Sequence, residues 1–249
     1  MSTPDQITVS PSRRGFLAGV WAALPVLLAV APFGLIFGTL AAEAGFDLAQ
    51  TMAFTSLVVA GASQLAALQL LSDGAPAIVA IITGAVVNLR MAMYSAAIAV
   101  HWQGLGMAWR IPAAFFLHDQ AFALSLNRYR AHPGESVADR AGFYFGIGAT
   151  TVTVWIAASW LGAEIGARIP EGWGLDFAAP ACFIGVAAPM IRGTANVVAA
   201  LTASVLAVLL AGLPGGAGLL VAAAAGIAAG MAAGRRVARR AAPVMEPAE

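Results

Sequence analysis

Two ionisable residues stand where a chain this apolar should carry none. Arg90 lies near the middle of the apolar stretch 75–100, and Asp119 lies near the middle of the apolar stretch 112–126. A charge at the centre of a membrane costs about 3 kcal/mol or more unless it is paired or hydrated. Because the two stretches follow each other and run antiparallel, their midpoints share a depth. We therefore expect an ion pair between Arg90 and Asp119 that faces away from lipid.

Two interpretations of this pair are open. In the first, the pair is a structural lock between two helices, and removal of either partner mainly unfolds the protein. In the second, one partner meets the charged end of a substrate, or Asp119 carries a proton during transport with the help of its neighbour His118. Both interpretations predict that the pair faces the interior of the bundle.

Other polar groups occupy mid-membrane positions near the pair. Gln64 follows Gly61 and Ser63, where the helix is weak and freed backbone groups can bind a ligand. Pro32-Phe33-Gly34 forms a second weak point, in the first apolar stretch. Any one of these side chains can instead hold helices together, but the set favours a binding site. The predicted substrate-binding residues are Arg90, Asp119, Gln64, Asn88, Gly61, Ser63, Phe33 and Gly34, and the predicted proton-coupling residues are Asp119 and His118.

Other chemistries find little support. His118 has no Cys or acidic cluster beside it, so no metal or other cofactor is expected. The Gly-rich stretch 212–218 lacks the Lys-Ser or Lys-Thr of a nucleotide-binding loop. Ser63 lacks the second Gly of a nucleophile elbow, which argues against an intramembrane hydrolase and against an enzyme in general. The net charge of +1, without a large basic patch, excludes nucleic acid as a partner.

The amino-acid composition indicates that membrane-spanning helices position these residues. Hydrophobic residues make up 60% of the 249-residue chain and charged residues 10%. This ratio excludes most soluble folds. The 27 Gly and 13 Pro residues are typical of membrane helices with interruptions. We expect an all-α, polytopic membrane helical bundle with several broken helices.

Eight apolar stretches approach the roughly 20 residues that a transmembrane helix needs. One of them, 177–191, is short, so seven spans with a re-entrant segment are the alternative. The eight expected spans are 16–42, 48–71, 75–100, 112–126, 140–161, 177–191, 194–213 and 215–233.

Arginine sets the expected orientation, because loops rich in Arg stay in the cytoplasm. Arg residues precede the first stretch, flank the loop after the fourth and follow the eighth, so an even number of spans must separate these groups. Both termini are then cytoplasmic, with a tail at 1–13, one transmembrane domain at 14–234 and a second tail at 235–249. Arg110 is the exception in this scheme, since it falls on the external side.

The sequence also suggests an internal repeat. Residues 15–19 (GFLAG) resemble residues 142–146 (GFYFG), and both segments open a long span. Two parallel structural repeats, about 14–127 and 140–234, would place a substrate site between the halves. Pro180, Pro189 and Gly193 then break the second half where the first half is broken. The alternative is that Gly, Ala and Phe recur through composition alone.

Four short segments, taken in their order and spacing, resemble the AzlC family, the large subunits of AzlC/AzlD-type branched-chain amino acid exporters. The resemblance covers about residues 14–233. The segments are Pro32-Phe33-Gly34 with Phe37-Gly38, Ala60 to Gln64, Asn88-Leu89-Arg90, and Asp119 with Phe122.

The resemblance implies a multi-pass subunit in the bacterial inner membrane that exports Val, Leu or Ile, and often Met. It also implies a separate, small AzlD-type membrane subunit as partner. One departure concerns coupling, because members of the family often carry Thr-Asp-Glu where this chain has His118-Asp119-Gln120. If that Glu takes up protons, Asp119 or His118 has to substitute for it here.

The physical demands of such a substrate fit the residues. A zwitterion needs a cationic and an anionic or dipolar partner, and an aliphatic side chain needs an apolar pocket. Arg90 and Asp119 can meet the first demand, or helix ends at Gly34, Gly61 or Gly193 can bind the carboxylate through backbone N–H groups. Phe33, Phe37 and Phe54 can meet the second. We predict a secondary, proton-coupled exporter, and the alternative is a non-transporting scaffold or assembly partner in the lipid bilayer.

Overall fold

The computed structural model describes residues 9–167, 191, 193–213 and 217–241, and helices dominate this part of the chain. It divides into two compact units, Met1–Leu68 with Gly84–Leu175, and Gln69–Thr83 with Asp176–Glu249. The expected all-α membrane class is confirmed. Among the described residues, four helices are long and apolar enough to cross a membrane: α1 (Arg13–Glu43), α4 (Ala77–Ala99), α7 (Val137–Gly166) and residues Gly218–Val237 of α10 (Ala217–Ala241).

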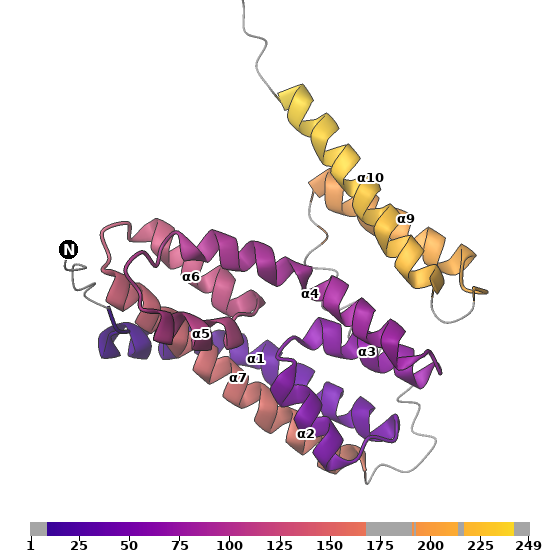
Figure 1. Cartoon of the computed structure of the whole chain (residues 1–249), viewed down its shortest axis with the longest axis horizontal. Coiled ribbons are helices and arrows are strands. Elements are labelled where there is room, and N and C mark those ends of the chain that lie inside the picture. Colours follow the sequence, from indigo (N-terminus) through magenta and orange to yellow (C-terminus); the bar gives the residue numbers. More distant parts are fainter. Residues whose placement is uncertain (1–8, 168–190, 192, 214–216, 242–249) are drawn as a thin grey trace, which may run out of the picture. The chain divides into compact units, whose positions relative to one another are not determined.

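Helices α1 and α7 form the frame of the first unit. They lie side by side and run in the same direction (Figure 1), because Gly19 of α1 packs against Phe143 and Gly38 packs against Ser159. Helix α1 continues through Pro25 and Pro32 without a break. The predicted helix end at Gly34 is therefore wrong. Gly34 instead lets α1 approach α7, since a Cβ there would lie 2.9 Å from the Cβ of Ala158.

Glycines on both helices permit this close approach. Each helix carries two pairs of Gly spaced four residues apart, a pattern that brings helix backbones together in membranes. A Cβ on most of these residues would overlap a backbone oxygen of the facing helix. The pairs are Gly15 with Gly19 and Gly34 with Gly38 on α1, and Gly142 with Gly146 and Gly162 with Gly166 on α7.

The expected span 48–71 is two short helices, α2 (Leu48–Leu57) and α3 (Gly61–Ser72), separated at residues 58–60. Asp47 caps α2 in a reciprocal capping box with Gln50. The helix weakness expected around Gly61 is confirmed, because α3 begins there. At about 15 and 18 Å in length, neither helix can cross a hydrocarbon layer of about 30 Å alone.

The expected span 112–126 is also broken, into α5 (Met107–Phe115) and α6 (Asp119–Ala131). Helix α5 passes Tyr144 of α7, whose hydroxyl donates to the Ala113 carbonyl at 2.7 Å. At the break, His118 contacts Thr151 near the middle of α7. Helix α6 then runs back toward the start of α7, where the Tyr129 hydroxyl donates to the Arg140 carbonyl at 2.7 Å. Both ends of this helix pair therefore lie near the start of α7, and the pair is re-entrant.

The loop between α4 and α5 lies at the same end. The Trp102 indole donates to the Tyr129 hydroxyl at 3.2 Å, and Leu105 forms a parallel bridge with Val9, which precedes α1. Burial, and then the guanidinium groups of Arg140 and Arg130, lower the pKa of His101 in this loop. Helix α4 therefore runs toward the end where α1 and α7 begin.

This arrangement corrects the eight-span scheme. A Cβ on Gly84 of α4 would lie 3.9 Å from the Ser63 carbonyl oxygen near the start of α3, so the chain reverses between these residues and α3 runs opposite to α4, away from the end where α1 and α7 begin. The stretches 48–71 and 112–126 are thus re-entrant helix pairs that enter from opposite ends of the α1–α7 frame. The scheme also placed Arg110 on the external side. In the structure Arg110 lies with Arg14, Arg128 and Arg140, and we call this the Arg-rich end of the first unit.

In the second unit, α9 (Gly193–Leu209) and α10 form an antiparallel pair that matches the expected spans 194–213 and 215–233. Gly226 packs against Ala203, and Gly230 packs against Ala199. The expected span 177–191, with Pro180 and Pro189, lies outside the described residues apart from Ile191. The two repeats, about 14–127 and 140–234, stay a prediction with which the parallel course of α1 and α7 agrees.

Candidate functional site

The predicted ion pair is confirmed as a contact. Arg90 Nη2 of α4 lies 3.1 Å from Asp119 Oδ2, the first residue of α6. Tyr94, one turn after Arg90, donates its hydroxyl to Asp119 Oδ1 at 3.0 Å and stacks on Phe122, with ring centroids 4.1 Å apart. The carboxylate is also favoured by the positive N-terminal end of α6. The charge of Asp119 is therefore balanced from three sides.

His118 locks the α5–α6 break onto α7. Its Nδ1 lies 2.8 Å from the Phe116 carbonyl, and its Nε2 lies 2.7 Å from the Thr151 hydroxyl. The Thr151 hydroxyl also contacts the Ile147 carbonyl at 2.8 Å. Both ring nitrogens of this buried side chain are thus engaged, which makes His118 a fixed structural contact and Asp119 the more accessible candidate for proton transfer.

Aromatic rings surround the α2–α3 break. Trp155 of α7 lies 6.1 Å, between ring centroids, from both Phe33 and Phe37 of α1. Phe37 meets Phe54 of α2 edge to face at 5.7 Å. The predicted apolar residues are therefore brought together, around a Trp that the sequence interpretation did not single out.

Several buried polar atoms of the first unit have no partner among the described residues, and two of the side chains, Gln64 and Trp155, adjoin this break. Gln64 is fully buried, and neither its amide oxygen nor its amide nitrogen makes a hydrogen bond. The indole nitrogen of Trp155 and the Oδ1 of Asn88 are also unsatisfied. Ser63 differs, because its hydroxyl donates to the Ala60 carbonyl at 2.9 Å within the break. Asn88 does not share a helix face with Arg90, since residues two apart on a helix point in different directions.

The two breaks meet at one depth. Gly61 at the α2–α3 break packs against Trp155, and His118 at the α5–α6 break contacts Thr151. Trp155 and Thr151 are one helical turn, about 6 Å, apart near the middle of α7. The N-terminal ends of α3 and α6, which carry partial positive charge, therefore both point at the centre of the frame.

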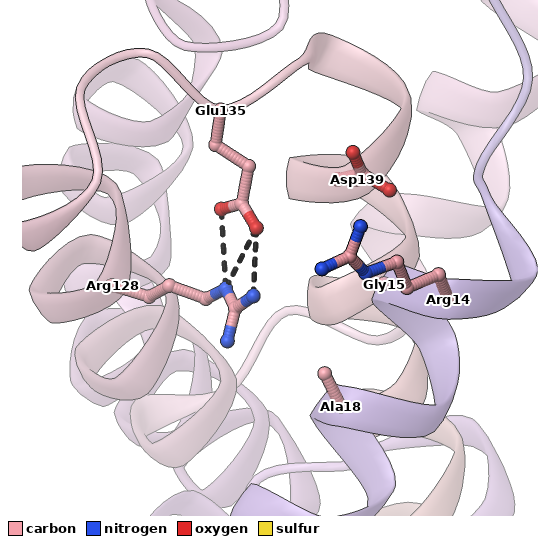
Figure 2. A pocket seen from close by; sticks show the side chains of 6 residues that line it. All are labelled: Arg14, Gly15, Ala18, Arg128, Glu135 and Asp139. Carbon is pink, nitrogen blue, oxygen red and sulfur yellow. Dashed lines mark hydrogen bonds and ion pairs between the residues drawn. The ribbon is translucent and has the colours of Figure 1, made fainter.

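A second polar region lies at the Arg-rich end (Figure 2). A pocket of about 170 Å³ lies here, lined by four charged residues and two small ones: Arg14, Arg128, Glu135, Asp139, Gly15 and Ala18. Arg128 binds Glu135 with both Nε and Nη2, and the shortest contact is 2.7 Å. The hydrogen bonds that Arg128 donates to the Glu135 carboxylate raise the pKa of Arg128. Ser12, which caps α1, also donates to Asp139, so this cluster ties α1, α6 and α7 together.

Three contacting residues were not predicted: Tyr94, Thr151 and Trp155. Each is a polar-tipped side chain near the middle of a long apolar helix, where such groups are expensive. Trp155 had the clearest signal, because membrane Trp residues collect at interfaces and this one does not.

The comparisons with known proteins agree with this architecture. The model of the AzlC protein family matches residues 25–169, which include both helix breaks. A protein of Helicobacter pylori (strain ATCC 700392 / 26695) named uncharacterized membrane protein is 30% identical over 175 residues, 70% of this chain and 74% of the relative. A protein of the same description from Archaeoglobus fulgidus is 30% identical over 182 residues, 72% of this chain and 77% of the relative.

A further relative has a more specific name. The inner membrane protein YgaZ of Escherichia coli K12 is 26% identical over 184 residues, which cover 70% of this chain and 73% of the relative. No solved structure matches the chain. With the family match spanning more than half of its residues, the chain belongs to the AzlC protein family of membrane proteins.

Proposed function

We propose that the protein is the large subunit of a secondary transporter that exports branched-chain amino acids, with methionine as a further substrate. One observation carries the proposal. Two re-entrant helix pairs from opposite ends of the α1–α7 frame bring their breaks to one depth, where Thr151 and Trp155 lie one turn apart. Interrupted helices that meet near mid-membrane are the usual construction of a transport site.

The chemistry at this meeting point suits a zwitterion with an apolar side chain. The two helix N-terminal ends form its polar side, and the Arg90–Asp119 pair lies at the start of α6. Phe33, Phe37 and Trp155 form its apolar side. Since a small substrate of this kind needs a few placed polar groups in an otherwise apolar pocket, the two sides together meet its requirements.

The energy source in this proposal is an ion gradient. The chain has no nucleotide-binding loop. The Asp119 side chain is 41% exposed and accepts bonds from two groups, so it can exchange a proton without leaving its helix. His118 contributes to proton coupling by holding the α5–α6 break, and with it Asp119, against Thr151 of α7.

Orientation and assembly also belong to the proposal. The Arg-rich end faces the cytoplasm, because Arg-rich segments stay there. Arg110, which the eight-span scheme placed outside, then follows this rule with the other Arg residues of that end. Both termini are then cytoplasmic in a bacterial inner membrane, and a small AzlD-type subunit is the partner.

The proposal is tested by leucine release. A strain that lacks the gene is loaded with leucine-containing dipeptides, and excreted leucine is measured by mass spectrometry after complementation. We expect the wild-type gene to restore excretion and Arg90→Ala to reduce it more than tenfold, because each 1.4 kcal/mol lost is tenfold. Arg130→Ala, an exposed Arg on the same helix pair as Asp119, is the matched control and keeps full excretion.

Membrane abundance of each variant is measured by immunoblot. If the wild-type gene restores no excretion of any branched-chain amino acid, the scaffold interpretation replaces the transport proposal. If Arg90→Ala excretes leucine normally at equal abundance, the ion pair has no part in transport.

A further inference from the structure

The α2–α3 break holds more hydrogen-bonding capacity than its described neighbours use. Gln64 is 0% exposed and Trp155 is 8% exposed, so neither side chain reaches bulk water. The Gln64 amide and the Trp155 indole N–H nevertheless have no partner within the described ranges. Buried polar groups in proteins are almost always hydrogen-bonded. Two such groups at one helix end therefore indicate a polar ligand.

The two side chains lie on the same side of α3. A Cβ on Gly61, the first residue of α3, would be 2.8 Å from Cη2 of Trp155, so Gly61 faces this ring directly. Gln64 is three residues further along, and residues three apart share a helix face. Gln64 and the N-terminal end of α3 thus lie on the face of α3 that packs against the six-membered ring of the Trp155 indole.

These groups complement the backbone of a free amino acid. Backbone N–H groups at a helix N-terminus bind carboxylates, and the helix dipole adds to the attraction. The Trp155 N–H is a further donor for the same carboxylate, and the Gln64 Oε1 is an acceptor for the ammonium group. No charged side chain is required for this arrangement.

The surrounding rings restrict the ligand's side chain. Phe33 and Phe37 lie 6.1 Å from the Trp155 ring, and Phe54 lies 5.7 Å from Phe37. A charged side chain among these rings would be buried without a counter-charge, which is strongly unfavourable. The arrangement accepts an aliphatic side chain.

We infer that Trp155 and Gln64, together with the N-terminal end of α3, bind the zwitterionic backbone of an apolar amino acid whose side chain lies against Phe33, Phe37 and Trp155. This subsite rests on the proposed function and makes it more specific. It assigns the substrate to the α2–α3 break and not to the Arg90–Asp119 pair, where both Asp119 oxygens are engaged by Arg90 and Tyr94 and Arg90 Nε has no partner among the described residues.

The test uses inside-out membrane vesicles from cells that express the full chain in its native membrane, so that an exporter takes up tritiated leucine. The variants are Trp155→Phe, which keeps a ring and removes the N–H, and Gln64→Met, which keeps the side-chain length. Each should raise the KM for leucine about tenfold with little change in the maximal rate, because one hydrogen bond to a charged group is lost. Trp109→Phe, in a ring contact with Phe145 away from the break, is the matched control and keeps the wild-type KM.

Competition identifies the groups that are bound. Unlabelled leucine should compete with the tracer, whereas leucinamide, which lacks the carboxylate, and 4-methylpentanoate, which lacks the ammonium, should compete at least tenfold more weakly. Wild-type vesicles that take up no leucine would overturn the proposed function and the subsite with it. Wild-type uptake with an unchanged KM in either variant, at equal membrane abundance, would overturn the subsite alone.

Discussion

The two helix breaks differ in how completely their polar groups are satisfied. At the α5–α6 break, Asp119 is held by Arg90 and Tyr94 and both nitrogens of His118 are engaged, while Arg90 Nε has no partner among the described residues. At the α2–α3 break, the buried polar groups of Gln64 and Trp155 have no partner in the described part of the chain, and aromatic rings replace charges. The two breaks pack on successive turns of α7, at Thr151 and Trp155.

This difference separates two tasks that a transporter must perform. A satisfied polar cluster fixes a helix pair in place and resists change until one of its groups is protonated or replaced. A polar cluster with unsatisfied hydrogen-bonding groups in apolar surroundings is stabilised most by a ligand that supplies the missing hydrogen bonds. We therefore assign conformational and proton coupling to the α5–α6 break and substrate recognition to the α2–α3 break.

The two breaks can meet at one depth only if both helix pairs are re-entrant. The side of the membrane on which each loop lies tests this, because a single Cys in a loop is either labelled from outside or not. A single Cys is placed at Gln103, Gly134 or Gly45 in a variant with Cys182→Ser, and labelled in intact cells with a membrane-impermeant maleimide. We expect Gln103 and Gly134 to be protected and Gly45 to be labelled. Gln103 lies in the loop that bridges to Val9, at the Arg-rich end.

Gly134 and Gly45 serve as controls, because the eight-span scheme and the structure place them on the same respective sides. Labelling of Gln103 in intact cells would make 112–126 a full span and would remove the re-entrant α5–α6 pair.

The next largest effect concerns the ion pair. Removing one partner leaves the other charge without its counter-charge at mid-membrane depth, and Arg90→Met or Asp119→Leu should each lower the free energy of unfolding by about 3 kcal/mol. The double variant should lose less than either single variant, because no isolated charge is left. Denaturant unfolding in detergent, read as a double-mutant cycle, measures the coupling. Additive losses would show that the 3.1 Å contact contributes nothing to stability.

Substitutions that push α1 away from α7 should affect leucine transport differently at the two ends of the frame. A Cβ on Gly38 or on Gly19 would overlap a carbonyl oxygen of α7. Each Ala substitution should therefore lower the free energy of unfolding by about 2 kcal/mol through overpacking. Only Gly38→Ala should also raise the KM for leucine, because Gly38 adjoins Phe37 and the aromatic rings, whereas Gly19 lies toward the Arg-rich end.

Gly134→Ala is the control for this pair, since a Cβ there meets no atom within 4 Å and should leave unfolding and KM unchanged. Equal KM values for Gly38→Ala and Gly19→Ala would mean that leucine is not recognised beside Phe37.

Much of this architecture could be predicted from local sequence. The charge of Arg90 demanded a partner at its own depth, and Asp119 was the candidate on the next stretch. The Gly-Ala-Ser segment at Gly61 predicted a helix break, which the structure has. Where the chain turns back could not be predicted in this way. Hydropathy is the same for one span and for two half-length helices that meet and return, and only contacts such as Trp102 with Tyr129 decide between them.

The unpredicted site residues share a physical reason. Trp155 and Thr151 matter because α1 and the two breaks converge on the middle of α7, and this convergence depends on contacts between residues far apart in sequence, 33 positions for His118 with Thr151 and 104 for Thr55 with Ser159. Gly34 shows the opposite error. Its sequence context resembled a helix break, but the packing of Gly34 against Ala158 keeps α1 intact.

The smallest expected effects compare single hydrogen bonds at the two breaks. Thr151→Val preserves shape but leaves His118 Nε2 buried without its partner, so it should lower the free energy of unfolding by about 1 kcal/mol. Gln64→Met should change it in the opposite direction by about the same amount, because it removes a buried amide that has no partner among the described residues. Unfolding in detergent without amino acid measures both. Added leucine should then stabilise Thr151→Val as it does the wild type, and should stabilise Gln64→Met by about 1.4 kcal/mol less, because its affinity is tenfold lower. A loss of stability in ligand-free Gln64→Met would mean that the amide is satisfied within the protein, and the α2–α3 break would then have no unfilled capacity for a substrate to use.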